Sequence, residues 1–239
     1  MNKSLDNYLC LICAKGNSKG LKKKNIKKIK GETLLEIAFK KAKKNKFQFF
    51  CLSTEDNKIR KLGKKIGLSS FFTRSKNLTK PNVSKLDVWK DCLKKSEIFY
   101  KKKFDYILDI EVTNPLTTKK DLKNFLDFFL SHDSSNVDGC LCVIESQKNP
   151  YFTILKKTVN GLKIFSDLKK KKIYSRQKAP ITYDHIGAFY ILKRNYLLKT
   201  KNLFDGNMIG YNIEYEKTFD IDNLNDFNLV NMILKNNKK

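Results

Sequence analysis

Apolar and polar positions follow two alternating periods along the first 146 residues. Short apolar runs typical of buried strands cover residues 8–14, 47–53, 70–74, 104–112 and 137–146. Between them, apolar residues recur at every third or fourth position and predict helices over residues 33–45, 54–67, 84–100 and 121–130. Strands separated by helices of this length predict crossover connections and a mostly parallel α/β sheet with helices on both faces.

Individual positions sharpen the helix predictions. Capping-box patterns, Thr33 with Glu36 and Thr118 with Asp121, mark two helix starts. The residues expected to face inward are Leu34, Ile37, Ala38, Lys41 and Ala42 in the first helix, Ile59, Leu62 and Ile66 in the second, and Leu86, Trp89, Leu93 and Phe99 in the third.

The pattern changes after about residue 150. An Asn160-Gly161 pair lies between two alternating runs in residues 153–165, which predicts a β-hairpin. A basic loop (169–185), a strand (187–193), an extended stretch (209–216), an acidic cluster (218–222) and a helix (225–235) follow. Because no Pro-, Gly- or Ser-rich linker and no repeat interrupts the chain, we expect one domain over residues 1–239, with about 145–180 as a hairpin insertion.

The charge of the chain favours an anionic partner without specifying one. Lys and Arg number 50 against 24 Asp and Glu, a net charge of +26 that fits nucleic-acid binding. The lysines are scattered through every segment, however, and no helix-turn-helix, zinc-finger or ribonucleoprotein motif is present. Nucleic acid is therefore an unlikely partner on this pattern, whereas a small polyanionic substrate remains compatible with it.

Cysteine and apolar usage predicts a cytoplasmic protein without a membrane segment. No apolar run approaches the roughly 20 residues needed to span a bilayer. Five cysteines lie in strand-like runs, where free thiols pack as small hydrophobes: Cys10, Cys13, Cys51, Cys140 and Cys142. The spacing of Cys10 and Cys13 sends them to opposite faces of a strand, which argues against a zinc site with Cys140 and Cys142.

The loop after the first strand, residues 13–25, combines glycines with cations. Gly16 and Gly20 permit close backbone approach, Ser18 offers a hydroxyl, and lysines surround them at positions 15, 19 and 24. Neither a Walker A loop nor a dinucleotide fingerprint is present. Since ligands of parallel sheets lie beyond the carboxyl ends of the strands, the loop is a candidate cradle for a triphosphate. Solvated lysines are the alternative.

The acidic cluster near the carboxyl terminus offers a candidate metal site. Asp220 and Asp222 direct their carboxylates to one side if the segment is extended. Two such oxygen ligands can hold Mg²⁺, which usually takes water and substrate phosphates as its remaining ligands. An ordinary helix start is the alternative.

Taken together, these motifs resemble the acylneuraminate cytidylyltransferases, the synthetases of CMP-nonulosonic acids. Residues 14–21 with Lys24 and Asn25 resemble the amino-terminal motif of that family, and co-linear matches continue to the end of the chain. These matches are Ser53-Thr54 with Asp56, Arg74 and Leu78, Asn114-Pro115-Leu116, Arg176-Gln177 with Pro180, residues 187–191, and residues 219–222 with Asp226-Phe227. Residues 108–111, 148–152 and 176–184 look most like the CMP-legionaminic acid synthetases.

The resemblance implies a Rossmann-like nucleotidyltransferase fold with a dimerisation hairpin. It implies an Mg²⁺-dependent transfer of CMP from CTP to the anomeric hydroxyl of an acidic nonulosonic sugar, with release of pyrophosphate, by a homodimer. A legionaminic-type acceptor is favoured, and sialic acid, pseudaminic acid and Kdo stay open. A non-catalytic nucleotide- or nucleic-acid-binding protein on the same fold is the alternative from another class.

The resemblance also assigns residues to roles. The expected nucleotide contacts are Ala14, Lys15, Gly16, Asn17, Ser18, Lys19, Lys24, Asn25, Arg74 and Lys85. The expected sugar contacts are Glu111, Thr113, Arg176, Gln177 and Tyr183. Lys15, Lys24, Asp220 and Asp222 are the expected catalytic residues, and the two aspartates the expected Mg²⁺ ligands. The chain departs from the family pattern at Lys15, Asn17, Pro81, Thr117 and Ile186.

Overall fold

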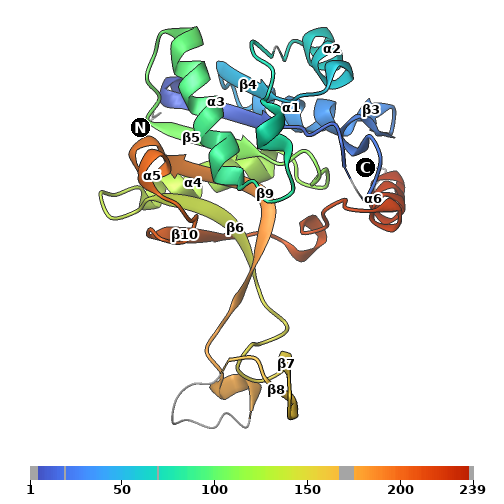
Figure 1. Ribbon diagram of the computed structural model, residues 1–239, viewed down its shortest axis with the longest axis vertical. Coiled ribbons are helices and arrows are strands. Elements are labelled where there is room, and N and C mark those ends of the chain that lie inside the picture. Colours follow the sequence, from blue (N-terminus) through green and yellow to red (C-terminus); the bar gives the residue numbers. More distant parts are fainter. Residues whose placement is uncertain (1–4, 19, 69, 167–174, 237–239) are drawn as a thin grey trace.

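The computed structural model describes residues 5–18, 20–68, 70–166 and 175–236. Its centre is a six-stranded sheet (Figure 1), in the spatial order β10 (Met208–Asn212), β6 (Gly139–Glu145), β9 (Tyr183–Lys193), β5 (Tyr106–Ile110), β1 (Tyr8–Cys13) and β4 (Phe49–Ser53). The pairs β4–β1, β1–β5 and β6–β10 are parallel, and β9 runs antiparallel to both of its neighbours, β5 and β6. The predicted mostly parallel sheet is confirmed.

Helices cover both faces of this sheet. One core lies under α1 (Leu34–Lys44), α2 (Asn57–Ile66), α4 (Lys119–His132) and α6 (Leu224–Asn236), and a second lies under α3 (Lys85–Tyr100) and α5 (Arg194–Lys199). Alternation along the strands separates the two cores: Cys10 belongs to the first and Cys13 packs against the second. Both predicted capping boxes are present, and no zinc-binding cluster occurs in the described part of the chain.

The prediction of a strand at residues 70–74 is wrong. These residues form bends and extended backbone without a sheet ladder. The Ser70 hydroxyl donates to the carbonyls of Leu52 and Phe72, so a side chain takes the place of a strand partner beside the edge strand β4. The prediction that Phe99 faces inward is also wrong. Its side chain is 55% exposed and stacks on Phe71, with ring centroids 4.2 Å apart.

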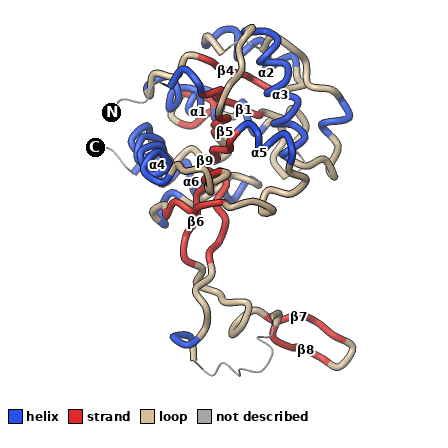
Figure 2. Tube along the Cα trace, turned by 90° about the vertical axis from the view of Figure 1, so that its left-hand side faces the viewer, coloured by secondary structure: helices blue, strands red, loops and turns tan. Residues whose placement is uncertain are grey.

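An arm projects from the carboxyl end of β6 and the amino end of β9, two inner strands of the sheet. Figures 1 and 2 show β6 and β9 continuing out of the body toward a hairpin of β7 (Leu155–Thr158) and β8 (Gly161–Ile164). The predicted Asn160-Gly161 turn connects these two strands, and Gly161 adopts a φ of 94°, which favours glycine. A second small hairpin, β2 (Lys28–Ile29) with β3 (Glu32–Thr33), precedes α1. None of the described helices is long and apolar enough to cross a membrane.

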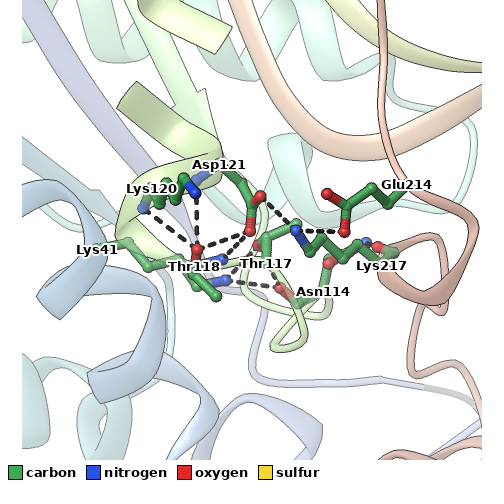
Figure 3. A network of polar contacts seen from close by, with 8 residues as sticks. All are labelled: Lys41, Asn114, Thr117, Thr118, Lys120, Asp121, Glu214 and Lys217. Carbon is green, nitrogen blue, oxygen red and sulfur yellow. Dashed lines mark hydrogen bonds and ion pairs between the residues drawn. The ribbon is translucent and has the colours of Figure 1, made fainter. Parts of the chain in front are cut away.

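A lysine lies in the core-facing side of α1. Lys41 is 5% exposed, as its helical position predicts, and its Nζ donates to the Asn114 carbonyl at 2.7 Å and to Thr117 Oγ1 at 2.6 Å (Figure 3). Burial lowers the pKa of Lys41 to about 7, although the charge of Asp121 acts in the opposite direction. A buried amine whose pKa differs this much from its unfolded value makes stability depend on pH.

Replacing Lys41 with methionine is expected to flatten that dependence. Between about pH 7 and the ordinary lysine pKa of 10.5, the unfolded chain holds a proton at Lys41 that the folded chain lacks. The free energy of unfolding of the wild type therefore rises with pH in this window, by up to about 1.4 kcal/mol per pH unit from this one group. Urea unfolding at pH 7 and pH 9 measures the slope.

The neighbouring exposed lysine provides the control. The Lys40 side chain is 52% exposed, so Lys40→Met should keep the wild-type slope. Equal slopes in the wild type and Lys41→Met would contradict the assignment of a depressed pKa to Lys41.

Candidate active site

The loop that follows β1 is held against the end of β4 and the start of α2. The Ala14 amide donates to the Ser53 carbonyl at 3.0 Å, and the Gly16 amide donates to Glu55 Oε1 at 2.8 Å. A Cβ on Gly16 would lie 2.5 Å from Asp56 Cβ, so only glycine permits this approach. Asn25 is buried, and its side-chain Nδ2 donates to the Lys15 carbonyl at 2.8 Å, which fixes the loop from inside.

The carboxyl-terminal acidic cluster lies directly against this loop. Lys24 Nζ and Asp222 Oδ1 form an ion pair at 3.0 Å, although 198 positions separate them in the chain. A Cβ on Gly20 would lie 2.3 Å from the carbonyl oxygen of Asp222, so the two backbones are also in close contact. The predicted cationic loop and the predicted carboxylate pair therefore lie side by side near the carboxyl ends of β1 and β5.

The two aspartates differ in their surroundings. Ile221 is fully buried, and its amide donates to the Thr113 carbonyl at 2.9 Å. Asp220 is mostly buried, whereas the Asp222 side chain is 77% exposed. Desolvation raises the pKa of Asp220, the charges of Glu111 and Asp222 add to this, and Thr113 and Lys24 oppose it.

The oxygen atoms at this position suit a hard divalent cation that takes its remaining ligands from a substrate and from water. Asp220 Oδ1 is buried and has no hydrogen-bond partner among the described residues. The described part of the chain has no cluster of three or more metal-ligating side chains here or elsewhere. Two carboxylates, one of them with an unpartnered oxygen, suit Mg²⁺, which commonly binds through one or two carboxylates plus phosphates and water.

Lys85 is already paired with carboxylates. Its Nζ lies 2.8 Å from Asp109 Oδ2, forms an ion pair with Glu111, and lies 4.4 Å from the ring centroid of Tyr190. Desolvation lowers the pKa of Lys85, but the charges of Asp109 and Glu111 outweigh it and hold the pKa well above its usual value. These partners support a role for Lys85 in orienting Glu111. They argue against the predicted direct contact between Lys85 and the nucleotide.

Arg74, another expected nucleotide contact, is buried and supports the end of β4. Its Nε donates to Ser53 Oγ at 2.9 Å and its Nη2 donates to the Ser53 carbonyl at 2.7 Å. The same carbonyl accepts a hydrogen bond from the Ala14 amide, so Arg74 stabilises the loop after β1 indirectly, through Ser53.

The expected sugar contacts fall into two groups. Glu111 and Thr113 lie beside Asp220 at the end of β5. Gln177 is exposed in η4 (Arg176–Lys178), which Figure 2 shows at the far end of the arm. Tyr183, the first residue of β9, is 53% exposed. Within one chain, the structure therefore does not bring Gln177 to the Lys24–Asp222 site. Lys19 and the side chain of Arg176 lie outside the described residues.

Sequence reasoning missed one pocket next to the site. A cavity of about 240 Å³ is lined by Ser84, Lys85, Leu86, Trp89, His185, Tyr190, Lys201, Asn202 and Leu203. His185 lies between the rings of Tyr190 and Phe204, and desolvation, together with the charge of Lys85, lowers its pKa. A role for Asp109 in the site was not predicted, although its carboxylate stands out inside the apolar run of β5.

Known proteins resemble this chain over most of its length. "Post-translational flagellin modification protein B" of Campylobacter coli is 31% identical over 232 residues, covering 97% of this chain and 96% of that protein. "CMP-N,N'-diacetyllegionaminic acid synthase" of Campylobacter jejuni is 32% identical over 227 residues, covering 95% and 94%.

Structural comparison and a family model agree with these relatives. The solved structure of CMP:2-keto-3-deoxy-manno-octonic acid synthetase complexed with CTP has a TM-score of 0.69 at 15% identity, covering 96% of this chain and 98% of its own, and shows the same fold. The family model described as cytidylyltransferase matches residues 9–239. The chain belongs to the cytidylyltransferase family and is a nucleotidyltransferase enzyme.

Proposed function

We propose that this enzyme transfers CMP from CTP to the anomeric hydroxyl of a nonulosonic acid, releases pyrophosphate, and favours a legionaminic-type acceptor. The contact between Lys24 and Asp222 carries the proposal, because it joins a triphosphate cradle to a carboxylate pair. The relative named for CMP-N,N'-diacetyllegionaminic acid supports the choice of acceptor. The product would be an activated sugar for glycosylation of flagellin or a surface glycan.

The residues of the site suit such a transfer. Phosphoryl-type transfer depends mainly on positioning and charge neutralisation. Lys15 and Lys24 can neutralise the phosphates, with Asn17 and Ser18 offering neutral hydrogen bonds. The acceptor hydroxyl attacks the α-phosphate while its proton passes to a carboxylate or to solvent. Glu111, held by Lys85, lies where it can orient the acceptor.

Asp220 and Asp222 are the residues that would hold Mg²⁺. The ion would supply charge neutralisation at the phosphates and a lower pKa for the attacking hydroxyl. The unpartnered Asp220 oxygen supports this assignment.

A panel of acceptors tests the function. Pyrophosphate release is measured with CTP, Mg²⁺ and either legionaminic acid, N-acetylneuraminic acid, pseudaminic acid or Kdo. The largest kcat/KM is expected for the legionaminic acid, and excess chelator should abolish release. A higher kcat/KM for another acid would replace the acceptor, and no release with any acid, together with tight salt-sensitive RNA binding, would favour a binding protein.

We also propose that the arm pairs two copies of this chain. Its hairpin exposes apolar side chains that no part of the described chain covers, with Leu162 at 68% and Val159 at 101% exposure. Contiguous exposed apolar side chains mark interaction sites, and a second copy is the partner that a two-fold homodimer supplies. An arm that reaches a second copy would carry Gln177 toward that copy's site, which it does not reach in its own chain.

A further inference from the structure

A polar network joins the turn after β5 to the segment that carries Asp220 and Asp222 (Figure 3). Lys217 Nζ lies 2.6 Å from Asp121 Oδ1 and 2.8 Å from Glu214 Oε2. The backbone carbonyl of Lys217 accepts a hydrogen bond of 3.0 Å from Asn114 Nδ2. Because Lys217 precedes Asp220 by three residues, these contacts fix the start of the carboxylate segment.

The acceptor of the Lys217 ion pair is itself fixed. Asp121 Oδ2 accepts hydrogen bonds of 2.7 Å from both the amide and the hydroxyl of Thr118, as the capping box of α4. Desolvation raises the pKa of Asp121, but Lys217 and Thr118 outweigh it and lower the pKa overall. The carboxylate is therefore ionised at neutral pH and anchored to the first turn of a long helix.

The same turn holds the segment on the other side of Asp220. The Thr113 carbonyl accepts the Ile221 amide at 2.9 Å, so residues 113 and 114 grip the segment at two points. Lys41 fixes this turn from beneath through the Asn114 carbonyl and Thr117 Oγ1. Positions 217 and 221 thus have separate anchors, and Asp220 lies between them.

We propose that Lys217 is a positioning residue whose ion pair with Asp121 sets the place of the Asp220 and Asp222 carboxylates. The proposal rests on the function proposed above, in which these carboxylates bind the metal. Supporting contacts of this kind hold reacting groups in place, and a displacement of about 1 Å costs on the order of a hundredfold in rate. The ammonium of Lys217 is paired with Asp121 and Glu214, so its effect on the two carboxylates passes through the segment.

The chain offers a matched control at the opposite end of α4. Lys193 Nζ lies 2.9 Å from Asp133 Oδ1, with side-chain exposures of 24% and 7%, against 20% and 8% for Lys217 and Asp121. Lys217→Met is expected to lower kcat by about tenfold to a hundredfold, whereas Lys193→Met keeps kcat within about twofold. Lys217→Arg should recover most of the loss, because a guanidinium keeps the charge and can donate to the Asp121 carboxylate.

Amide hydrogen exchange without substrate separates this inference from the proposed function. The backbone amides of Ile221 and Asp222 should exchange faster in Lys217→Met than in the wild type. Their exchange rates in Lys193→Met should equal those of the wild type. Asp121→Asn, which keeps an oxygen for the helix cap, should have the same effect as Lys217→Met and serves if that variant fails to fold. Unchanged exchange at residues 221 and 222, or an unchanged kcat beside faster exchange, overturns the inference. If the wild type releases no pyrophosphate, the proposed function fails and exchange alone decides the positioning role.

Discussion

Replacing Asp222 with alanine is expected to lower the turnover of pyrophosphate release by about a thousandfold, with the protein still folded. The Asp222 side chain is 77% exposed, so its loss removes no core packing. The substitution removes one of the two carboxylates proposed for Mg²⁺ and releases Lys24 from its ion pair. Steady-state turnover at saturating CTP and acceptor measures the loss, and thermal unfolding monitored by circular dichroism measures the fold.

An exposed carboxylate on the same segment is the control for this prediction. Glu216, in η5 (Tyr215–Lys217), is exposed to solvent, and Glu216→Ala should keep turnover within about twofold. Near-normal turnover in Asp222→Ala would remove Asp222 from the metal site and leave Asp220 without its proposed partner.

Mixing two inactive variants is expected to restore about a quarter of the wild-type turnover. One variant carries Asp222→Ala, and the other carries Arg176→Ala with Gln177→Ala in the arm. If each arm serves the site of the second copy, a mixed dimer contains one site with both defects and one with neither. Random pairing makes half of the dimers mixed, and half of their sites are intact.

A second mixture controls for restoration without arm exchange. Asp222→Ala with Lys24→Ala places both defects in the body of the protein, so every site of a mixed dimer keeps one defect and no recovery is expected. Absence of recovery in the arm mixture, once native mass spectrometry detects the mixed dimer by its intermediate mass, would mean that the arm serves its own chain. A monomer at working concentration would end the dimer proposal.

The parts of the fold that the sequence predicted are those that depend on local chemistry. The capping boxes at Thr33 and Thr118 and the Asn160-Gly161 turn each specify a backbone conformation within a few residues, and all three are present. The strand expected at 70–74 failed because its apolar residues are too few to distinguish a strand from a packed loop. What decided its structure was the hydroxyl of Ser70, whose partner on β4 is 18 positions away.

The site divides in the same way. The position of the Lys24 loop beyond the end of β1 follows from parallel topology, whereas its contact with Asp222 depends on the path of the segment after η5. The partners of Lys85, Arg74 and Lys217 could not be predicted, because each pairs with a residue on an element distant in sequence. A lysine in a lysine-rich chain carries no local signal that separates a buried ion pair from a solvated side chain.

The arm is rooted in the middle of the sheet, which determines how it can move. Its two stems are β6 and β9, and residues 189–193 of β9 are bonded to β5 as well. The Ala188 carbonyl on β9 accepts the amide of Glu111, so the stem is one hydrogen bond away from the site. The arm therefore cannot move as a hinged loop does unless hydrogen bonds between β9 and its neighbours β5 and β6 break. A displacement of the arm that moved residue 188 of β9 would disturb the hydrogen bond to the backbone of Glu111.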